Sequence, residues 1–322
     1  MKKVIIILGL LGVLFANFLN AQNLQKPNYI TSGYYQLIYE ADTAYLVGNY
    51  EYAYKKIQEA ETKMPLIEQP NYYEISNYIE LLIEHLNYKK ALHYIEILVK
   101  NYGYPIEKFE NKDYFTNLQQ NTNWDKLKKQ LSKLYEKFYK KVDKNLLNTL
   151  IEMCENDQKV RNEEDSDTKW QHLNEVDSIN TLKMKEIFKN YGFPNAKMLG
   201  YSNYEPNELY SRIKVMLMHF IEIQDTAYFK PVLLKFIEKG ECAPQVLGSY
   251  VDSRDRFNME KQKYTYGTYY NTRDQIKDFE NLDERRKAIG MPPFEIDLKI
   301  NAIFNLDSIM KADYGIQIEE DN

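Results

Sequence analysis

Residues able to bind anions or move protons gather in the second half of the chain, beginning with the stretch ENDQKVRNEEDSD. Asp157 and Arg161 lie four residues apart there, at the end of a predicted helix. This spacing allows an ion pair, and an exposed pair contributes only about 0.3–0.5 kcal/mol. Other groups make the pair more interesting, because imidazole titrates near neutral pH and guanidinium binds carboxylate or phosphate. These groups are His219, Asp255, Arg256 and Tyr266.

Two hypotheses from different classes explain this set. In the first, the protein is a binding or scaffold protein with a polar ligand clamp or structural network, and the ligand-binding candidates are Arg161, Gln158, Arg256 and Tyr266. In the second, it is a metal-independent, hydrolase-like enzyme. His219 would be the acid or base, Asp255 would orient it, Arg161 and Arg256 would hold an anion, and Asp157 is a further catalytic candidate. The sequence favours the first and leaves open whether the protein is an enzyme, since it contains no GxSxG, Walker loop or paired-carboxylate motif.

The surroundings of His219 predict that these residues converge in space. Apolar residues flank it on both sides, in VMLMHFIEI. A buried imidazole without a partner costs about 1–3 kcal/mol, so polar groups must approach it. We expect Asp157, Arg161 and at least one of Asp255 and Arg256 to do so. In VDSRDRF the pairing stays ambiguous, because Asp252 or Asp255 and Arg254 or Arg256 fit equally well.

Metal and cofactor motifs do not accompany these residues. His85 and His93 are eight residues apart, without HExxH or CxxC spacing, so no metal or cofactor is expected. Cys154 and Cys242 could form one disulfide in an oxidising compartment or remain small buried thiols. Both alternatives stay open.

Helical patterns dominate the chain and predict a mainly α fold. Twelve glycines and ten prolines are few for 322 residues. In the second half, Leu147, Leu150, Ile151 and Cys154 are expected to face inward on a helix that Asp157 and Arg161 extend. Asp177 or Ser178 is expected to cap the next helix, which would bury Ile179, Leu182 and Ile187 and end at Gly192. Further helices are predicted from Pro206, over YFKPVLLKFIEKGE and over DERRKAIG, and KYTYGTYYN is expected to be extended or a turn.

The first half contains two similar helices at a separation of 38 residues. Ala53, Ile57 and Ala60 in one match Ala91, Ile95 and Leu98 in the other. Small residues at these offsets let antiparallel helices approach closely. The pattern over about residues 34–103 resembles the tetratricopeptide repeat, with Pro65 at the closing proline and Gly103 near that point in the second copy. The resemblance implies helical hairpins and a groove for a protein or peptide partner, with packing support as the alternative.

A series of short motifs in the second half resembles a widespread bacterial domain of unknown function. The motifs, over about residues 147–295, are Asp157, Gln158 and Arg161; Val176, Asp177 and Asn180; Tyr191 to Pro194; His219; Asp255 and Arg256; Tyr266 to Thr268; and Arg285 to Pro292. Tyr264, Phe193 and Met218 depart from residues usual in that family. The resemblance implies a set of residues to test and no particular activity.

The first residues predict export. Lys2 and Lys3 precede the apolar run Val4 to Phe15, and FLNAQ offers a cleavage point after Ala21. The run is shorter than the roughly 20 residues that span a bilayer, so we expect no stable membrane span after cleavage and a periplasmic or secreted protein. The chain is mildly acidic, with net charge −5, which disfavours nucleic acid as a partner.

The expected organisation has four parts. They are a signal peptide (1–21), a tetratricopeptide-like helical region (22–145), a helical domain of unknown function (146–300) and a C-terminal segment with an acidic tail (301–322). The helical-repeat hairpins would pack on the C-terminal, mostly helical domain with its short Tyr-rich extended segment. Between them, eight lysines from Lys126 to Lys144 surround the apolar stripe Leu127, Leu131, Leu134, Phe138 and Val142. We interpret these lysines as a solvated helix face, with an anionic partner as the alternative.

Overall fold

A computed structural model describes residues 28–68, 74–164, 167–201, 206–220, 223–257, 263–269 and 272–305. The predicted mainly α fold is confirmed: these residues form helices and no strand, with only an isolated bridge between Tyr264 and Ile276. The helices of the first half of the described chain are α2 (Tyr34–Leu46), α3 (Tyr50–Lys63), α4 (Glu74–Glu84), α5 (Tyr88–Tyr102), α6 (Glu107–Glu110), α7 (Phe115–Gln120), α8 (Trp124–Tyr139) and α9 (Lys144–Arg161). They are followed by α10 (Asp167–Asn190), α11 (Ala196–Leu199), α12 (Pro206–His219), α13 (Ile223–Glu238), α14 (Pro244–Phe257), the 3₁₀ turns η1 (Arg273–Gln275) and η2 (Phe279–Asn281), α15 (Leu282–Ala288) and α16 (Phe294–Asn305).

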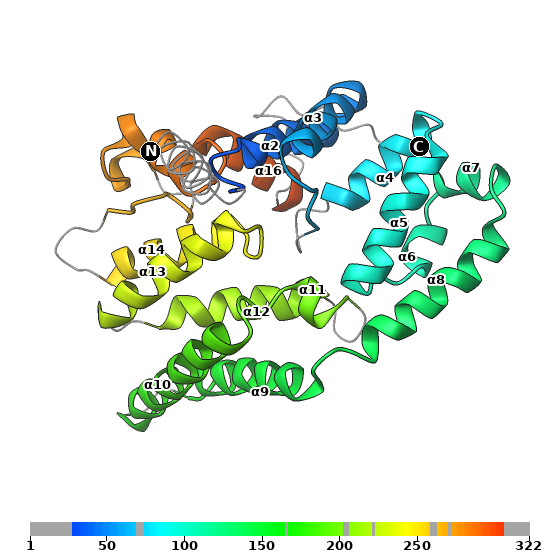
Figure 1. Ribbon diagram of the computed structural model, residues 1–322. Helices are drawn as coiled ribbons and strands as arrows, with labels where there is room; N and C mark the ends of the chain where they lie inside the picture. Colours follow the sequence, from blue (N-terminus) through cyan, green and yellow to red (C-terminus); the bar gives the residue numbers. More distant parts are fainter. Residues whose placement is uncertain are drawn as a thin grey trace, which may run out of the picture.

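The two similar helices of the first half are α3 and α5, and each forms a hairpin with the helix before it (Figure 1). The six matched residues, Ala53, Ile57, Ala60, Ala91, Ile95 and Leu98, are all buried. The same spacing of 38 residues continues into the turns. Gly48 and Leu86 both have positive φ, and the side chains of Asn49 and Asn87 cap the helices that follow. An asparagine cap satisfies backbone N–H groups in the first turn, which accounts for the sharp start of both helices.

Helix α8 is the lysine-rich helix of the sequence. Leu131 and Phe138 are buried, while Leu127 and Leu134 are partly buried against the same core. Val142 lies beyond the end of the helix. The apolar stripe therefore packs inward as the spacing predicted, and it packs mainly against α5.

Helix α10 corrects the predicted boundary. It begins at Asp167, ten residues before the predicted cap, so Asp177 lies inside the helix. Ile179 and Leu182 are more than half exposed, while Met184 and Ile187 are buried. The prediction was wrong on the first two because Asn180 and Thr181 occupy the inward face instead. The helix faces α9 with polar as well as apolar groups.

The last described helix returns to the first described one: α16 lies beside α2, as Figure 1 shows. The hydroxyl of Tyr35 donates to the carbonyl of Ile237 at 2.9 Å, and the hydroxyl of Tyr39 donates to the carbonyl of Gly290 at 2.9 Å. Tyrosine can do this because its ring packs in the core while its hydroxyl finds a polar partner. These two tyrosines thus join segments that are more than 200 residues apart in sequence. The division at residue 145 stays a prediction.

Several sequence predictions concern termini or thiols. The signal peptide and the acidic tail beyond residue 305 lie outside the described residues. Within the described ranges, no helix has the length and apolar character needed to cross a membrane. Cys154 and Cys242 are both buried and unbonded, as in the thiol alternative.

Glu68 is a buried carboxyl group in the first half that makes the stability of the protein depend on pH. It is 3% exposed, accepts hydrogen bonds from the backbone of Ile75 and Ser76 at 2.8 and 3.3 Å, and accepts another from the Ser76 hydroxyl at 2.6 Å. It therefore caps the start of α4 from seven residues away. Burial raises the pKa of Glu68 from 4.5 to about 7, although these hydrogen bonds lower it.

We expect this group to make the protein less stable as pH rises. Because the folded pKa exceeds the unfolded value, the folded state holds the proton more tightly, and this stabilisation is complete below pH 4.5 and lost by about pH 7. The difference corresponds to about 3 kcal/mol. Glu68→Gln should reduce the fall in unfolding free energy between pH 4.5 and 7, measured by urea denaturation. The control Glu96→Gln, at an exposed position of α5, should show the same fall in unfolding free energy as the wild type. Equal pH profiles for wild type and Glu68→Gln would refute the assignment.

Candidate functional site

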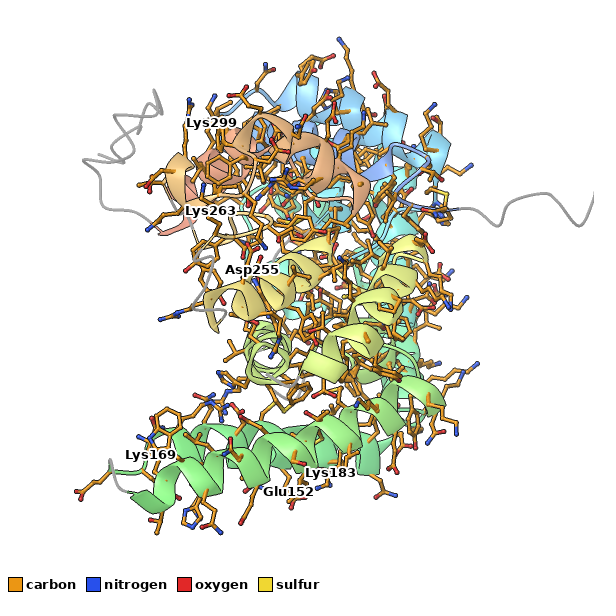
Figure 2. All side chains as sticks on the ribbon, turned by 90° about the vertical axis from the view of Figure 1, so that its left-hand side faces the viewer. Glu152, Lys169, Lys183, Asp255, Lys263 and Lys299 are labelled. Carbon is orange, nitrogen blue, oxygen red and sulfur yellow. The ribbon has the colours of Figure 1, made fainter. Side chains whose placement is uncertain are left out.

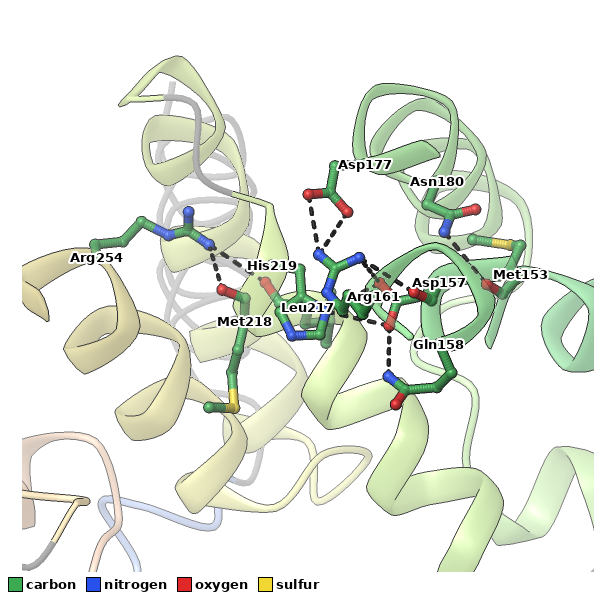
Figure 3. A network of polar contacts seen from close by, with 10 residues as sticks. All are labelled: Met153, Asp157, Gln158, Arg161, Asp177, Asn180, Leu217, Met218, His219 and Arg254. Carbon is green, nitrogen blue, oxygen red and sulfur yellow. Dashed lines mark hydrogen bonds and ion pairs between the residues drawn. The ribbon is translucent and has the colours of Figure 1, made fainter. Parts of the chain in front are cut away.

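Asp157 is the centre of a polar network between α9, α10 and α12 (Figure 3). Its carboxylate is 1% exposed and accepts from Gln158 Nε2 at 2.8 Å. Arg161 Nη1 lies 3.0 Å from one carboxylate oxygen, and His219 Nδ1 lies 2.9 Å from the same oxygen. Asp157 is on the inward face of α9 because it lies three residues after buried Cys154. The ion pair with Arg161 is therefore partly buried, unlike an ordinary surface pair.

Arg161 joins Asp157 to a second carboxylate on α10. Its Nη2 donates to both oxygens of Asp177, at 2.8 and 3.0 Å, while Nη1 also donates to the backbone carbonyl of Asp157 at 3.2 Å. Burial raises the pKa of Asp177, and the Arg161 guanidinium lowers it. A planar guanidinium suits this double role because its N–H groups point in fixed directions. Asp177, which the sequence placed at a helix cap, is thus part of the network.

His219 is the last residue of α12 and is held through one ring nitrogen. Its Nδ1 faces Asp157, and Nε2 has no hydrogen-bond partner among the described residues. The His219 side chain is 25% exposed and that of Arg161 is 21% exposed. The network is therefore open to solvent on the side of these two residues. Asp157 fixes the ring in the manner of a carboxylate that orients a catalytic or ligand-binding histidine.

Arg254 on α14 reaches the end of the same helix. Its Nη2 donates to the carbonyls of Met218 and Leu217 at 3.2 and 3.4 Å, and its guanidinium lies 4.8 Å from the ring centre of Tyr250. Its Nε and Nη1 are buried and have no acceptor at hydrogen-bond distance among the described residues, although the guanidinium lies near the Tyr250 hydroxyl, whose pKa burial raises and the guanidinium lowers. Burial lowers the pKa of Arg254, and the negative charge of Asp177 is among those that raise it. A buried hydrogen-bond donor without an acceptor costs about 1–3 kcal/mol, and more when it belongs to a charged group such as guanidinium.

The structure gives the remaining predicted residues other neighbours. Asp255 accepts from the backbone and hydroxyl of Thr265 at 2.8 and 2.6 Å, and from Lys277 Nζ at 2.6 Å. In Figure 2, Asp255 lies at mid-height, above the α9–α10 hairpin that Glu152, Lys169 and Lys183 mark at the bottom of the view. The expectation that Asp255 orients His219 is corrected: Asp157 does so.

Arg256 and Tyr266 also lie outside this network. Arg256 is exposed, and no described hydrogen bond or ion pair joins it to His219. Tyr266 is 5% exposed, and its backbone N–H donates to Asp252 at 2.8 Å. Asp252 also accepts from the backbone and hydroxyl of Thr268. This part of the motif series therefore fastens the Tyr-rich segment to α14.

The available chemistry is that of cations and one oriented imidazole. Burial and the negative charge of Asp157 raise the pKa of Cys154 to about 12, so this thiol stays protonated and is a poor nucleophile. Within the described part of the chain, no group of three or more His, Cys, Asp or Glu side chains is placed to hold a metal ion. Two guanidinium groups beside an imidazole suit a carboxylate or phosphate.

Comparison with known proteins adds no relative: no protein-family model, no curated protein and no solved structure matches the chain. The resemblances to the tetratricopeptide repeat and to the domain of unknown function therefore stay predictions. What the site does has to be argued from its geometry.

Proposed function

We propose that the protein is an exported, helical-repeat binding protein that holds a small anion beside His219 and Arg254. The observation that carries this proposal is the Arg254 guanidinium, whose buried Nε and Nη1 have no acceptor in the part of the chain that the structure describes. Hydrogen-bond donors on a buried cation are normally matched, so an arrangement that leaves two unmatched fits an anionic ligand.

The charges around the site support an anion over a cation. Arg161 is already neutralised by two carboxylates, Asp157 and Asp177. Arg254 has no carboxylate within ion-pair distance among the described residues, and Asp225 and Asp177 act on it only from farther away. Arg254 therefore brings a positive charge that the network does not pair. An anion accepting from Arg254 could also meet the free Nε2 of His219, whose ring Asp157 holds in place.

The N-terminal hairpins support a second element of the proposal, a protein or peptide partner. Hairpins α2–α3 and α4–α5 repeat the same caps and buried residues. Stacked helical hairpins present a continuous surface that suits extended partners. Export and a periplasmic or secreted location rest on the first 21 residues of the sequence.

We expect Arg254→Gln to weaken binding of inorganic phosphate and acetate at least tenfold. The expected loss follows from removing charge-assisted hydrogen bonds, each of which contributes about 1.5–3 kcal/mol. Isothermal titration calorimetry measures it. Arg256→Gln is the matched control, because Arg256 is two residues away on the same helix and exposed. Wild-type protein that binds neither anion, or equal binding by Arg254→Gln, would contradict the proposal.

A metal-independent, hydrolase-like enzyme is the second candidate, and one observation favours it. Asp157 orients His219 with Nε2 free, which is the arrangement of a general acid or base. No described contact supplies His219 with a nucleophile, so water would have to serve. The same titration with p-nitrophenyl phosphate separates the two candidates, since only an enzyme releases p-nitrophenol.

A further inference from the structure

A cavity of about 390 Å³ lies where α5 and α8 end beside α11, and it shares no residue with the His219 network. Its volume is within the range of small-molecule sites, about 300–1,000 Å³. Its lining has basic and apolar side chains together with the neutral polar Asn101. The basic ones are Lys100, Lys141 and Lys197, and the apolar ones are Phe138, Val142 and Met198.

The three lysines have no carboxylate within ion-pair distance among the described residues. Lys197 Nζ lies 5.4 Å from the ring centre of Tyr102, which gives it an aromatic neighbour instead of an acid. Burial lowers the pKa of Lys197, and the charge of Glu241 raises it. Three ammonium groups around one cavity repel one another, so an anion between them would be stabilised.

Support for helix ends is the simplest other role for these lysines, because cations favour the C-termini of helices. The end of α5 already has other partners. The carbonyls of Leu98 and Val99 accept from the backbone of Tyr104 and Gly103, and the Gly103 carbonyl accepts from the Tyr139 hydroxyl at 2.9 Å. The lysines are not needed to satisfy these groups. Their side chains are free to hold a ligand.

We propose that this cavity binds an amphipathic organic anion. Its phosphate or carboxylate group would lie among Lys100, Lys141 and Lys197, and a short hydrocarbon part would cover Phe138, Val142 and Met198. Charge alone would suit any anion, but buried apolar area adds about 25 cal/mol per Å² only for a ligand with a hydrocarbon part. On this proposal Lys141, near the end of the lysine-rich stretch, binds a ligand, whereas in a solvated helix face it would only contact water.

The test uses octyl phosphate below its micelle-forming concentration, titrated into the mature full-length protein. Lys141→Gln/Lys197→Gln should weaken binding at least tenfold. The matched control Lys133→Gln/Lys137→Gln removes the same charge from α8 at positions that are exposed like the three lining lysines but lie outside the cavity lining, and it should leave binding unchanged. Equal weakening by both double variants, or no binding by wild type, would overturn the proposal. Circular dichroism checks that every variant keeps its helices.

Three further arms test each part of the ligand. Val142→Asp places a negative charge in the lining outside any helix and should also abolish octyl phosphate binding. Inorganic phosphate should bind at least tenfold more weakly than octyl phosphate, and equal affinities would refute the apolar part. Octyl glucoside should not compete, and competition by it would refute the anionic part. Octanoate in place of octyl phosphate distinguishes a fatty acid from a phosphate ester, and tighter binding of either supports the proposal.

Discussion

Asp157→Ala should lower the free energy of unfolding by about 3 kcal/mol. Its carboxylate is 1% exposed and serves Gln158, Arg161 and His219 at once. Removing one member of a buried charge pair typically costs about 3–5 kcal/mol, because the other charge stays in a poorly solvated place. The lower end applies here, since Arg161 keeps Asp177 and is one-fifth exposed. Urea denaturation followed by circular dichroism measures the change.

Two comparisons separate the network from its surroundings. Glu152→Ala removes an exposed carboxylate from the same helix and should change stability by less than about 0.5 kcal/mol. Arg254→Gln should keep most of the stability of the wild type, because Arg254 makes no contact with Asp157 and already has two unmatched N–H groups. An Asp157→Ala protein as stable as the Glu152→Ala protein would show that the network contributes nothing to folding.

The repeating helices were predictable because their signal is local. Ala53, Ile57 and Ala60 recur at helical spacing, and the same spacing places their counterparts in α5 in the core. A buried stripe at positions i, i+4 and i+7 needs no knowledge of the neighbouring helix. The meeting of Asp157 and Arg161 with His219 was also predictable, because an imidazole in an apolar helix needs a polar partner. Which carboxylate orients His219 was not.

Helix α10 shows why the rest was harder. Ile179 and Leu182 suggested an inward face, but they are exposed, and Asn180 and Thr181 are buried. Asn180 Nδ2 donates to the carbonyl of Met153 at 3.3 Å, so the facing helix supplies the reason for its burial. Tertiary contacts of this kind override local pattern. Asp177 was therefore assigned to a cap, although it faces Arg161 from the middle of a longer helix.

Helix α14 shows the same limit in the assignment of its charged residues. Asp252 and Asp255 are three residues apart, so they share a face, and both hold the segment from Thr265 to Thr268. Arg254 points elsewhere and reaches α12. From the sequence, either acid and either arginine of VDSRDRF could have approached His219. A shift of one or two residues along a helix turns the side chain by about 100° or 200° around its axis. Only the packing of α14 on α12 and on the Tyr-rich segment decides between them.

The motif RRKAIG places the charged side chain of Arg286 in the interior of the protein. Arg286 is completely buried, with Nε donating to the Pro292 carbonyl and Nη1 donating to the Tyr266 carbonyl, both at 2.6 Å. Nη2 donates to the Asp297 carboxylate at 2.5 Å. One guanidinium thus connects α15, the Tyr-rich segment and α16. Helix α16 in turn packs on α2, so this side chain helps, with Tyr35 and Tyr39, to hold the last described helices against α2.

Arg286→Ala should therefore lower the free energy of unfolding by about 4 kcal/mol, more than Asp157→Ala. It removes three charge-assisted hydrogen bonds, to two carbonyls and to Asp297, and leaves buried polar groups short of a donor, at about 1–3 kcal/mol each. Arg286→Lys should recover only part of the loss, because an ammonium group cannot reach three partners in the fixed directions of a guanidinium. The exposed neighbour Lys287→Ala is the control and should behave as wild type. If Arg286→Ala unfolds at the same urea concentration as Lys287→Ala, the interior position of Arg286 is refuted. Phosphate titration of the folded Arg286→Lys protein should match wild type, since Arg286 lies outside the His219 network and acts only on the fold.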